Sequence, residues 1–263
     1  MARPVIAMLT DFGTRDHYAG TMKGVALGIC SDVTLVDISH DIAAHDVLGG
    51  ALELAAAYRY FPAGTIFLVV VDPGVGSTRR GIAADTGDYS FVAPDNGVLT
   101  AVLDDHPAKR IVELTERKYT RPTVSRTFEG RDRFAPAAAW LAKGIDLTAL
   151  GRTAGAIHRL EIPRPTVEDD HIDGQVLRVD RFGNLITNID GALIERFRLP
   201  LVHAGNHAFP LLRTYGDTRP GEYLALVNSF GVIEIARAEN SAADGLGLSR
   251  GAPVVVRDRT DQP

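Results

Sequence analysis

The chain of 263 residues carries 28 basic and 33 acidic side chains, and 45% of its residues are hydrophobic. This length accommodates one large domain or two of modest size, with enough apolar residues for a sizeable core. The formal net charge of −5 argues against a polybasic binder of nucleic acid or of anionic membranes, because such binding depends on an excess of cations.

The chain also lacks the sequence signals of a membrane or secreted protein. Its longest strongly apolar run, Ile66–Val71, is far shorter than the roughly 20 residues that span a bilayer. The first residues lead directly into a strand-like run, without the pattern of a signal peptide. Cys30 is the single cysteine and has no partner for an intrachain disulfide. We therefore expect a cytoplasmic protein.

The first part of the chain alternates strand-like and helix-like segments. Apolar residues at helical spacing follow Asp16, which can cap that helix. The other expected helices are residues 46–60, 98–103 and 134–142, and the expected strands are residues 5–9, 33–38, 65–71, 89–92 and 111–114. This alternation predicts an α/β N-terminal domain over residues 1–162, with a mainly parallel sheet covered on both faces.

The pattern changes near residue 160. Residues 163–170 combine prolines with three consecutive acidic residues and are typical of a linker. Beyond them, short strand-like runs are separated by Gly, Pro and Asn; they cover residues 174–179, 185–189, 222–227, 232–236 and 252–256. This pattern predicts a smaller, all-β C-terminal domain over residues 171–263.

Four carboxylates fall where predicted strands of the N-terminal domain end: Asp11, Asp37, Asp72 and Asp95. Ligands of open α/β sheets bind at the carboxyl ends of the strands. Aspartate at such a position also caps helices and shapes turns, which requires no ligand. Four of them in one domain favour a site that uses at least one.

The loop from Asp72 to Ser77 is rich in glycine and is followed by Arg79 and Arg80. Its backbone N–H groups can form a nest for an anion, and an arginine beside a carboxylate keeps that carboxylate ionised. A tight turn with solvated arginines explains the same residues. The loop does not match the phosphate-binding pattern of Walker-type NTPases.

Three further polar clusters allow a functional or a purely structural interpretation. Residues 127–132 precede the last helix of the N-terminal domain; there Glu129 and Arg131 can form a surface ion pair and Asp132 can cap the helix. Residues 180–184 and 228–231 each combine an aromatic ring with an amide, which suits stacking on a flat heterocycle. Ordinary β-turns account equally well for both.

The eight histidines show no zinc-binding spacing, so we expect no metal site. His40-Asp41 resembles an isolated metal-ligand pair, although a loop histidine satisfied by hydrogen bonds explains it. A metal-dependent phosphohydrolase using Asp11, His40, Asp41 and Asp72 is nevertheless one alternative.

Taken together, six motifs in order along nearly the whole chain resemble the S-adenosyl-L-methionine hydroxide adenosyltransferases, relatives of the fluorinase and chlorinase enzymes. The motifs are Leu9-Thr10-Asp11-Phe12-Gly13, Val71-Asp72-Pro73-Gly74-Val75-Gly76, Ala93-Pro94-Asp95-Asn96-Gly97, Thr127-Phe128-x-Gly130-Arg131-Asp132-x-Phe134-Ala135-Pro136, Phe182-Gly183-Asn184-x-x-Thr187-Asn188 and Asn228-Ser229-x-Gly231.

The resemblance implies a fold, an assembly and a reaction. The implied fold is an α/β domain followed by a barrel-like β domain. The implied assembly is a homotrimer, with active sites between the N-terminal domain of one subunit and the C-terminal domain of its neighbour. Water or hydroxide would attack C5′ of S-adenosyl-L-methionine (SAM) to give adenosine and L-methionine, with SAM as substrate and no cofactor or metal.

The resemblance also assigns roles to individual residues. Asp72 would hold or deprotonate the water, and Arg79 would stabilise its hydroxide character. Asp11 would bind the ribose diol. The other implied contacts are Phe182 and Asn184 to adenine, Asp180 and Ser229 to the methionine amine and carboxylate, and Arg237 in the same region.

Glu129 departs from the family pattern, in which hydroxide-forming members usually have histidine. It can be a general base if burial raises its pKa, a partner of Arg79 or Arg131, or the sign of a weakened enzyme. The last possibility corresponds to a non-catalytic module that binds SAM or adenosine. A halogenase is disfavoured because the halogenating relatives lack the aspartate and have an added loop, and a negative Asp72 would repel a halide.

Overall fold

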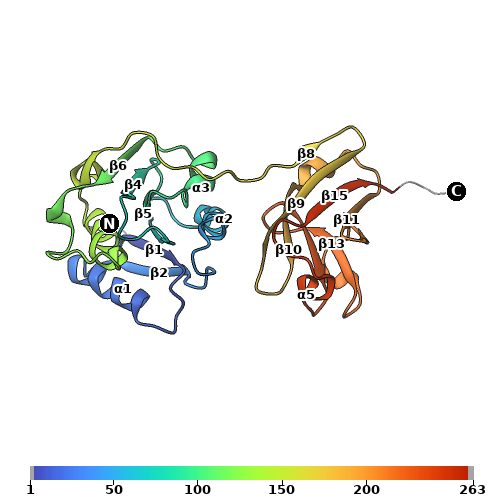
Figure 1. The fold of residues 1–263 in the computed structure, drawn as a ribbon, viewed down its shortest axis with the longest axis horizontal. Coiled ribbons are helices and arrows are strands. Elements are labelled where there is room, and N and C mark those ends of the chain that lie inside the picture. Colours follow the sequence, from blue (N-terminus) through green and yellow to red (C-terminus); the bar gives the residue numbers. More distant parts are fainter. Residues whose placement is uncertain (1–2, 260–263) are drawn as a thin grey trace. The chain divides into compact units, whose positions relative to one another are not determined.

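The structure is a computed structural model that describes residues 3–259. It divides into two compact units between Ile162 and Pro163. Unit 1 combines a large sheet with most of the α-helices, and unit 2 is built mainly of strands (Figure 1). Within the described residues, no helix is long and apolar enough to cross a membrane.

Unit 1 contains one seven-stranded sheet with the strand order β2-β1-β3-β5-β4-β6-β7. The strands are β1 (Val5–Thr10), β2 (Thr34–Ser39), β3 (Ile66–Val70), β4 (Gly81–Asp85), β5 (Ser90–Pro94), β6 (Arg110–Leu114) and β7 (Gly151–Thr153). Every residue of β3 is buried, as expected for a central strand covered on both faces.

This sheet is mixed, so the prediction of a mainly parallel sheet is wrong for its second half. Strands β2, β1, β3 and β5 pair in parallel, whereas β4 pairs antiparallel with both β5 and β6, and β7 continues antiparallel. A tight turn at Gly87, with φ of +99°, joins β4 directly to β5. Such a short connection permits only antiparallel pairing, because a parallel pair requires a longer crossover.

Helices cover both faces of the sheet, as predicted. One core cluster joins the sheet to α1 (Tyr18–Ile29) and α4 (Ala135–Ala142). The other joins it to α2 (Val47–Ala57) and α3 (Thr100–Asp105). Asp46 caps α2 by accepting a hydrogen bond from the amide of Gly49 at 2.9 Å.

The predicted cap of α1 is wrong. His17 rather than Asp16 occupies the N-cap position, and its side chain makes no capping hydrogen bond. The His17 ring instead lies 3.0 Å from the hydroxyl of Thr21, one turn into the helix.

Unit 2 contains an eight-stranded antiparallel sheet that curls into a nearly closed barrel. Its strands are β8 (Thr166–Val167), β9 (His171–Val179), β10 (Leu185–Asp190), β11 (Pro200–Ala204), β12 (His207–Pro210), β13 (Tyr223–Val227), β14 (Val232–Arg237) and β15 (Pro253–Asp258). The two edge strands approach each other where Leu211, just after β12, forms a bridge with Ala225 of β13.

Apolar side chains of these strands form the main core cluster of unit 2. A second, smaller cluster contains Leu224 and Leu226 of β13 and Ala236 of β14. The prediction of an all-β domain is wrong in one respect, because a short helix, α5 (Ala242–Leu246), follows β14. Ser241 caps this short helix by accepting a hydrogen bond from the amide of Asp244 at 3.1 Å. The predicted linker region contains β8, which pairs with β9.

Candidate functional site

Two of the predicted carboxylates, Asp11 and Asp72, lie at the same edge of the unit 1 sheet. Thr10, the last residue of β1, pairs with Val70, the last residue of β3, and the two strands run in parallel. Asp11 and Asp72 therefore follow neighbouring strands at their carboxyl ends, where α/β sheets bind ligands. One carboxylate oxygen of Asp11 accepts a hydrogen bond from the amide of His45 at 2.9 Å.

Asp72 belongs to a buried charged cluster with Arg79 and Glu129. The Nη2 atom of Arg79 donates to Asp72 Oδ2 at 2.5 Å and to Glu129 Oε2 at 2.8 Å. The three side chains are only 6%, 8% and 9% exposed for Asp72, Arg79 and Glu129, respectively. Charge-assisted hydrogen bonds of this kind are strong and directional, so the cluster is held in one arrangement. The structure thus brings together the three residues predicted to be catalytic.

The glycine-rich loop is a tight turn that returns the chain so that Arg79 meets Asp72. The amide of Ser77 donates to the carbonyl of Gly74 at 3.2 Å, and the hydroxyl of Ser77 accepts from the amide of Arg79 at 3.2 Å. Gly76 has φ of +78°, and a Cβ there would lie 2.3 Å from the carbonyl oxygen of Arg126. The prediction of an anion nest is not fully correct, because these bonds use N–H groups that the nest would need. The alternative of a tight turn with solvated arginines is not fully correct either, because the Arg79 side chain is buried.

Glu129 reaches the cluster from a π-helical turn, Gly130–Phe134, which runs into α4. The turn also supports the arginine, because the Arg79 guanidinium lies over the Phe134 ring at 5.3 Å. Gly130 allows close packing, since a Cβ there would approach Met22 Sδ to 3.0 Å. π-Helical turns are rare and occur frequently at functional sites.

Two sequence-based interpretations near this turn are wrong. Glu129 is not a surface partner of Arg131, because Arg131 binds the neighbouring Asp132 through Nε and Nη2 at 2.7 and 2.8 Å. Asp132 does not cap α4 either. It is fully buried and accepts a third hydrogen bond from the amide of Ser125 at 2.8 Å.

The cluster retains unused hydrogen-bonding capacity in its interior. Among the described residues, Asp72 Oδ1 and Arg79 Nε are buried polar atoms without a hydrogen-bond partner. Buried polar atoms are normally hydrogen-bonded, so these two are candidates for contact with a small polar ligand. Burial raises the pKa of Asp72; the positive charge of Arg79 opposes this rise, and the negative charge of Glu129 adds to it.

The remaining strand-end groups have structural partners. The His40 ring is buried, with Nδ1 at 2.8 Å from the Thr10 hydroxyl and Nε2 at 3.0 Å from Asp37. Arg80 donates to Asp95 through Nε at 2.8 Å. Across residues 3–259, no three His, Cys, Asp or Glu side chains converge as metal ligands. These contacts agree with a hydrogen-bonded His40 and give no support to the phosphohydrolase alternative.

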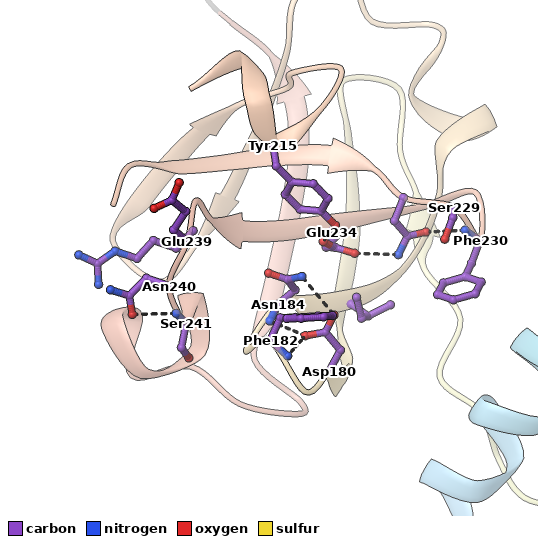
Figure 2. A pocket seen from close by; sticks show the side chains of 13 residues that line it. Asp180, Phe182, Asn184, Tyr215, Ser229, Phe230, Glu234, Glu239, Asn240 and Ser241 are labelled. Carbon is purple, nitrogen blue, oxygen red and sulfur yellow. Dashed lines mark hydrogen bonds between the residues drawn. The ribbon is translucent and has the colours of Figure 1, made fainter. Parts of the chain in front are cut away.

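Unit 2 presents a pocket of about 730 Å³ on the barrel (Figure 2). All five residues that we predicted to bind substrate from the C-terminal domain lie in its lining: Asp180, Phe182, Asn184, Ser229 and Arg237. The other lining residues are Ile186, Tyr215, Asn228, Phe230, Glu234, Glu239, Asn240 and Ser241. Residues far apart in the sequence therefore converge on one hollow.

The turn between β9 and β10 is organised by Asp180. Its Oδ1 atom accepts from the amides of Phe182 and Asn184, both at 2.9 Å, and its Oδ2 atom accepts from the Asn184 side chain at 3.1 Å. Gly183 has φ of +82°, and a Cβ there would lie 2.2 Å from Ser241 Oγ. The turn leaves the Phe182 ring 76% exposed, although a large apolar side chain favours burial.

The second turn, between β13 and β14, depends on a buried carboxylate. Asn228 Oδ1 accepts from the amide of Phe230 at 2.9 Å, and Asn228 Nδ2 donates to Glu234 at 3.2 Å. The Tyr215 hydroxyl donates to the other oxygen of Glu234 at 2.5 Å, and Figure 2 shows the Tyr215 and Glu234 side chains meeting. Burial raises the pKa of Glu234 despite these hydrogen bonds, and the negative charge of Asp180 adds to the rise.

Sequence reasoning missed Tyr215 and Glu234. A signal for Glu234 was present, because a lone carboxylate stands between the apolar residues Ile233 and Ile235 of a predicted strand. Arg237, at the end of the same strand, was predicted. It donates through Nε to the carbonyl of Gly221 at 2.9 Å and lies over the Tyr223 ring at 5.0 Å.

Comparison with known proteins places these observations in a family. Residues 6–151 match the model of the SAM hydroxide adenosyltransferase N-terminal domain, and residues 174–255 match that of the C-terminal domain. A curated (R)-S-adenosyl-L-methionine hydrolase from Salinispora tropica is 39% identical over 254 residues, covering 94% of this chain and 95% of that protein. A fluorinase from an Actinoplanes strain is 30% identical over 289 residues, covering 96% of this chain and 97% of that protein.

A solved structure agrees with this result. The crystal structure of a conserved protein from Thermotoga maritima matches with a TM-score of 0.90 at 36% identity, covering 96% of this chain and 99% of that one. Both units therefore have counterparts in one known chain.

Proposed function

Because this chain belongs to the SAM hydroxide adenosyltransferase family, we propose that it hydrolyses SAM to adenosine and L-methionine by attack of water or hydroxide at C5′. The observation that carries the proposal is the Asp72–Arg79 pair. It combines a carboxylate oxygen and a guanidinium N–H that are both buried and, among the described residues, unpartnered. A water molecule can donate to the first and accept from the second.

The chemistry fits this pair of groups. The water oxygen forms a bond to C5′ while the C5′–S bond breaks. The electron pair of the C5′–S bond goes to sulfur and gives the thioether of methionine. The sulfonium is a good leaving group, so the reaction as proposed needs no acid and no metal. The difficult requirement is a reactive nucleophile, which calls for a positioned base. Asp72 accepts the water proton, and Arg79 stabilises the developing hydroxide.

The low exposure of the cluster supports the same step. A negative nucleophile and a positive sulfonium neutralise each other as the new bond forms. A site from which water is excluded strengthens their attraction and reduces competing solvation. A halide would be repelled by the negative charge of Asp72, so we propose hydrolysis rather than halogenation.

We assign the substrate contacts as the family resemblance implies. Asp11 binds the ribose diol, since one carboxylate offers two acceptors for two hydroxyls. The exposed ring of Phe182 stacks on adenine, and the amide of Asn184 hydrogen-bonds its edge. A second set completes the binding of the methionine portion: Asp180, Ser229 and Arg237.

We further propose a homotrimer in which unit 1 of one subunit and unit 2 of another build each active site. The support is the family resemblance and the distribution of the candidate residues over both units. We expect a molar mass of three times 28.3 kDa in light scattering.

Subunit complementation tests the shared site. Co-expression of Asp72→Asn chains with Phe182→Ala/Asn184→Ala chains should restore about a quarter of wild-type turnover, because a random trimer unites intact halves at that frequency. Activity no higher than the sum of the two separate variants would contradict a site shared between subunits.

The function itself is tested by incubating the purified protein with SAM and separating the products by chromatography. We expect adenosine and L-methionine in equal amounts, no halogenated nucleoside when chloride or fluoride is added, and no effect of a chelator. Binding of SAM without release of adenosine would instead identify a non-catalytic binding module.

A further inference from the structure

Glu129 and Asp72 differ in how their carboxylate oxygens are used. Glu129 Oε2 accepts from Arg79, and its other oxygen faces Arg133 Nη2 at 3.6 Å. Asp72 gives Oδ2 to Arg79, while its Oδ1 atom is buried without a partner among the described residues. Glu129 Oε1 therefore already faces a cation, whereas Asp72 Oδ1 has no hydrogen-bond donor among the described residues. We assign the water molecule to Asp72 Oδ1.

From this geometry we infer that Glu129 is a positioning residue, which holds Arg79 and strengthens Asp72 as the base that accepts the water proton. The inference rests on the proposed hydrolysis and extends it to the residue at which this chain departs from its family pattern. It also assigns the general-base role to Asp72 and removes it from Glu129.

The argument is electrostatic. Two carboxylate oxygens bound to one nitrogen lie no more than about 5 Å apart. At that separation the negative charge of Glu129 makes ionisation of Asp72 less favourable. Burial and the Glu129 charge both raise the pKa of Asp72, against the opposing charge of Arg79. A stronger base takes the proton of water more readily, so this neighbour increases the reactivity of the nucleophile.

The surrounding charges determine whether a substitution raises or lowers the pKa of Asp72. The charges that act directly on Asp72 are those of Arg79 and Glu129, and Arg133 pairs in turn with Glu129. The other charged groups on the surrounding elements are Asp11 after β1, the Arg80–Asp95 pair beside β4 and β5, and Arg131 and Asp132 of the π-helical turn, which pair with each other. Removing the charge of Glu129 leaves Arg79 to act alone on Asp72 and lowers its pKa. Removing the charge of Arg133 leaves the negative charge of Glu129 less compensated, which raises the pKa of Asp72.

These opposite signs give the test. Turnover requires ionised Asp72, so the acid limb of the kcat/KM profile follows its pKa. We expect Glu129→Gln to move this limb to lower pH by about one pH unit, with a lower plateau rate. Glu129→His, which restores the residue usual in the family, should move it in the same direction. Arg133→Gln should move it to higher pH by a smaller amount.

A second measurement does not depend on turnover. The difference between the acid–base titrations of the wild type and Asp72→Asn reports the proton bound by Asp72. The same difference taken in the Glu129→Gln background should have a lower midpoint. Agreement between this shift and the shift of the acid limb supports the inference.

Three results would overturn it. An acid limb that Glu129→Gln leaves in place or moves to higher pH would show that the charge does not act on Asp72. A Glu129→Gln variant as inactive as Asp72→Asn, while folded, would make Glu129 the base. An unchanged titration midpoint would refute the coupling without any assay. Wild-type protein that releases no adenosine would instead refute the proposed function, so the two failures are distinguishable.

Discussion

The candidate catalytic residues of unit 1 are buried charges fixed by ion pairs: Asp72, Arg79 and Glu129. The candidate residues of unit 2 instead surround an open pocket and include an exposed aromatic ring. In unit 1, Asp72 and Arg79 are less than a tenth exposed, and each holds the other. In unit 2, Phe182 is three-quarters exposed, and its backbone amide is held by the Asp180 side chain. Burial of charge suits a group that must react, and an exposed ring suits one that must bind and release a flat ligand.

This difference separates two kinds of mutational effect. Changes in the buried cluster should alter the rate of the chemical step, because its groups act on the nucleophile. Changes in the pocket should alter the affinity for substrate. A substitution in the buried cluster that changes only KM would contradict this distinction, and so would a substitution in the pocket that changes only kcat.

The largest effect is expected for Asp72→Asn. It keeps the shape of the side chain and removes the base, so kcat should fall by roughly 10³-fold with little change in KM. Release of adenosine measures it. The matched control is Asp37→Asn. Asp37 lies in β2, and its carboxylate binds Lys23 and His40. Near-normal turnover by Asp72→Asn would contradict the assigned role.

The next effect concerns stability and distinguishes Asp132 from Asp72. Burial opposes the ionisation of Asp132, but hydrogen bonds from Arg131 and the Ser125 amide lower its pKa below the ordinary value of aspartate. Its contribution to stability is therefore present above the ordinary pKa of aspartate and is lost as the pH falls through the folded-state value. We expect Asp132→Asn to reduce the free energy of unfolding at pH 7 by about 2 kcal/mol.

Asp72→Asn should behave in the opposite way. The raised pKa of Asp72 means that its ionised form is less favourable in the folded protein than in the unfolded chain. Its stabilising contribution is present at low pH and is lost as the pH rises through the folded-state pKa. Denaturant unfolding at pH 7 should therefore show Asp72→Asn to be at least as stable as the wild type. Equal destabilisation by both substitutions would refute this contrast.

A smaller effect is expected for Phe182→Ala. Loss of one aromatic surface stacked on a base costs about 1–2 kcal/mol, so KM should rise about tenfold while kcat changes less. Tyr60→Ala is the matched control, because that ring is 77% exposed in unit 1 and lies outside the pocket. An unchanged KM for Phe182→Ala would remove the proposed adenine contact.

The smallest effect is expected for Tyr215→Phe. It removes the hydrogen bond to the buried Glu234 and should weaken substrate binding by about 1 kcal/mol, a several-fold rise in KM. Steady-state kinetics measures the change. Glu234→Gln can still accept a hydrogen bond from Tyr215, so we expect it to bind substrate more tightly than Glu234→Ala does. If both Glu234 variants bind equally well, the carboxylate does not organise the pocket.

The sequence predicts most of the parallel half of the sheet and much less of the rest. The continuous apolar run around β3 and the strand-end aspartates are local signals that survive in the structure. Strand β4, with the sequence GIAAD, was missed because glycine and alanine have low strand propensity and its pairing is decided by neighbouring strands. The short strands β11 and β12 begin and end, respectively, at proline and were missed for a similar reason.

The candidate site was predictable to a similar degree. Asp72 and Arg79 are seven residues apart and follow one strand, so their proximity can be read locally. Glu129 meets Arg79 across 50 positions, through a π-helical turn that no periodicity indicates. The Tyr215–Glu234 pair likewise depends on the curvature of the barrel. Contacts between distant segments are set by packing, and a single sequence does not contain that information in local form.

The central claim is that the oxygen of water becomes the 5′-hydroxyl oxygen of adenosine. Turnover of SAM in water enriched in ¹⁸O, followed by mass spectrometry of both products, tests it directly. We predict one ¹⁸O atom in adenosine, located at the 5′-hydroxyl, and none in the thioether side chain of methionine. Adenosine without the label, or label at any other carbon of the products, would contradict attack of water at C5′.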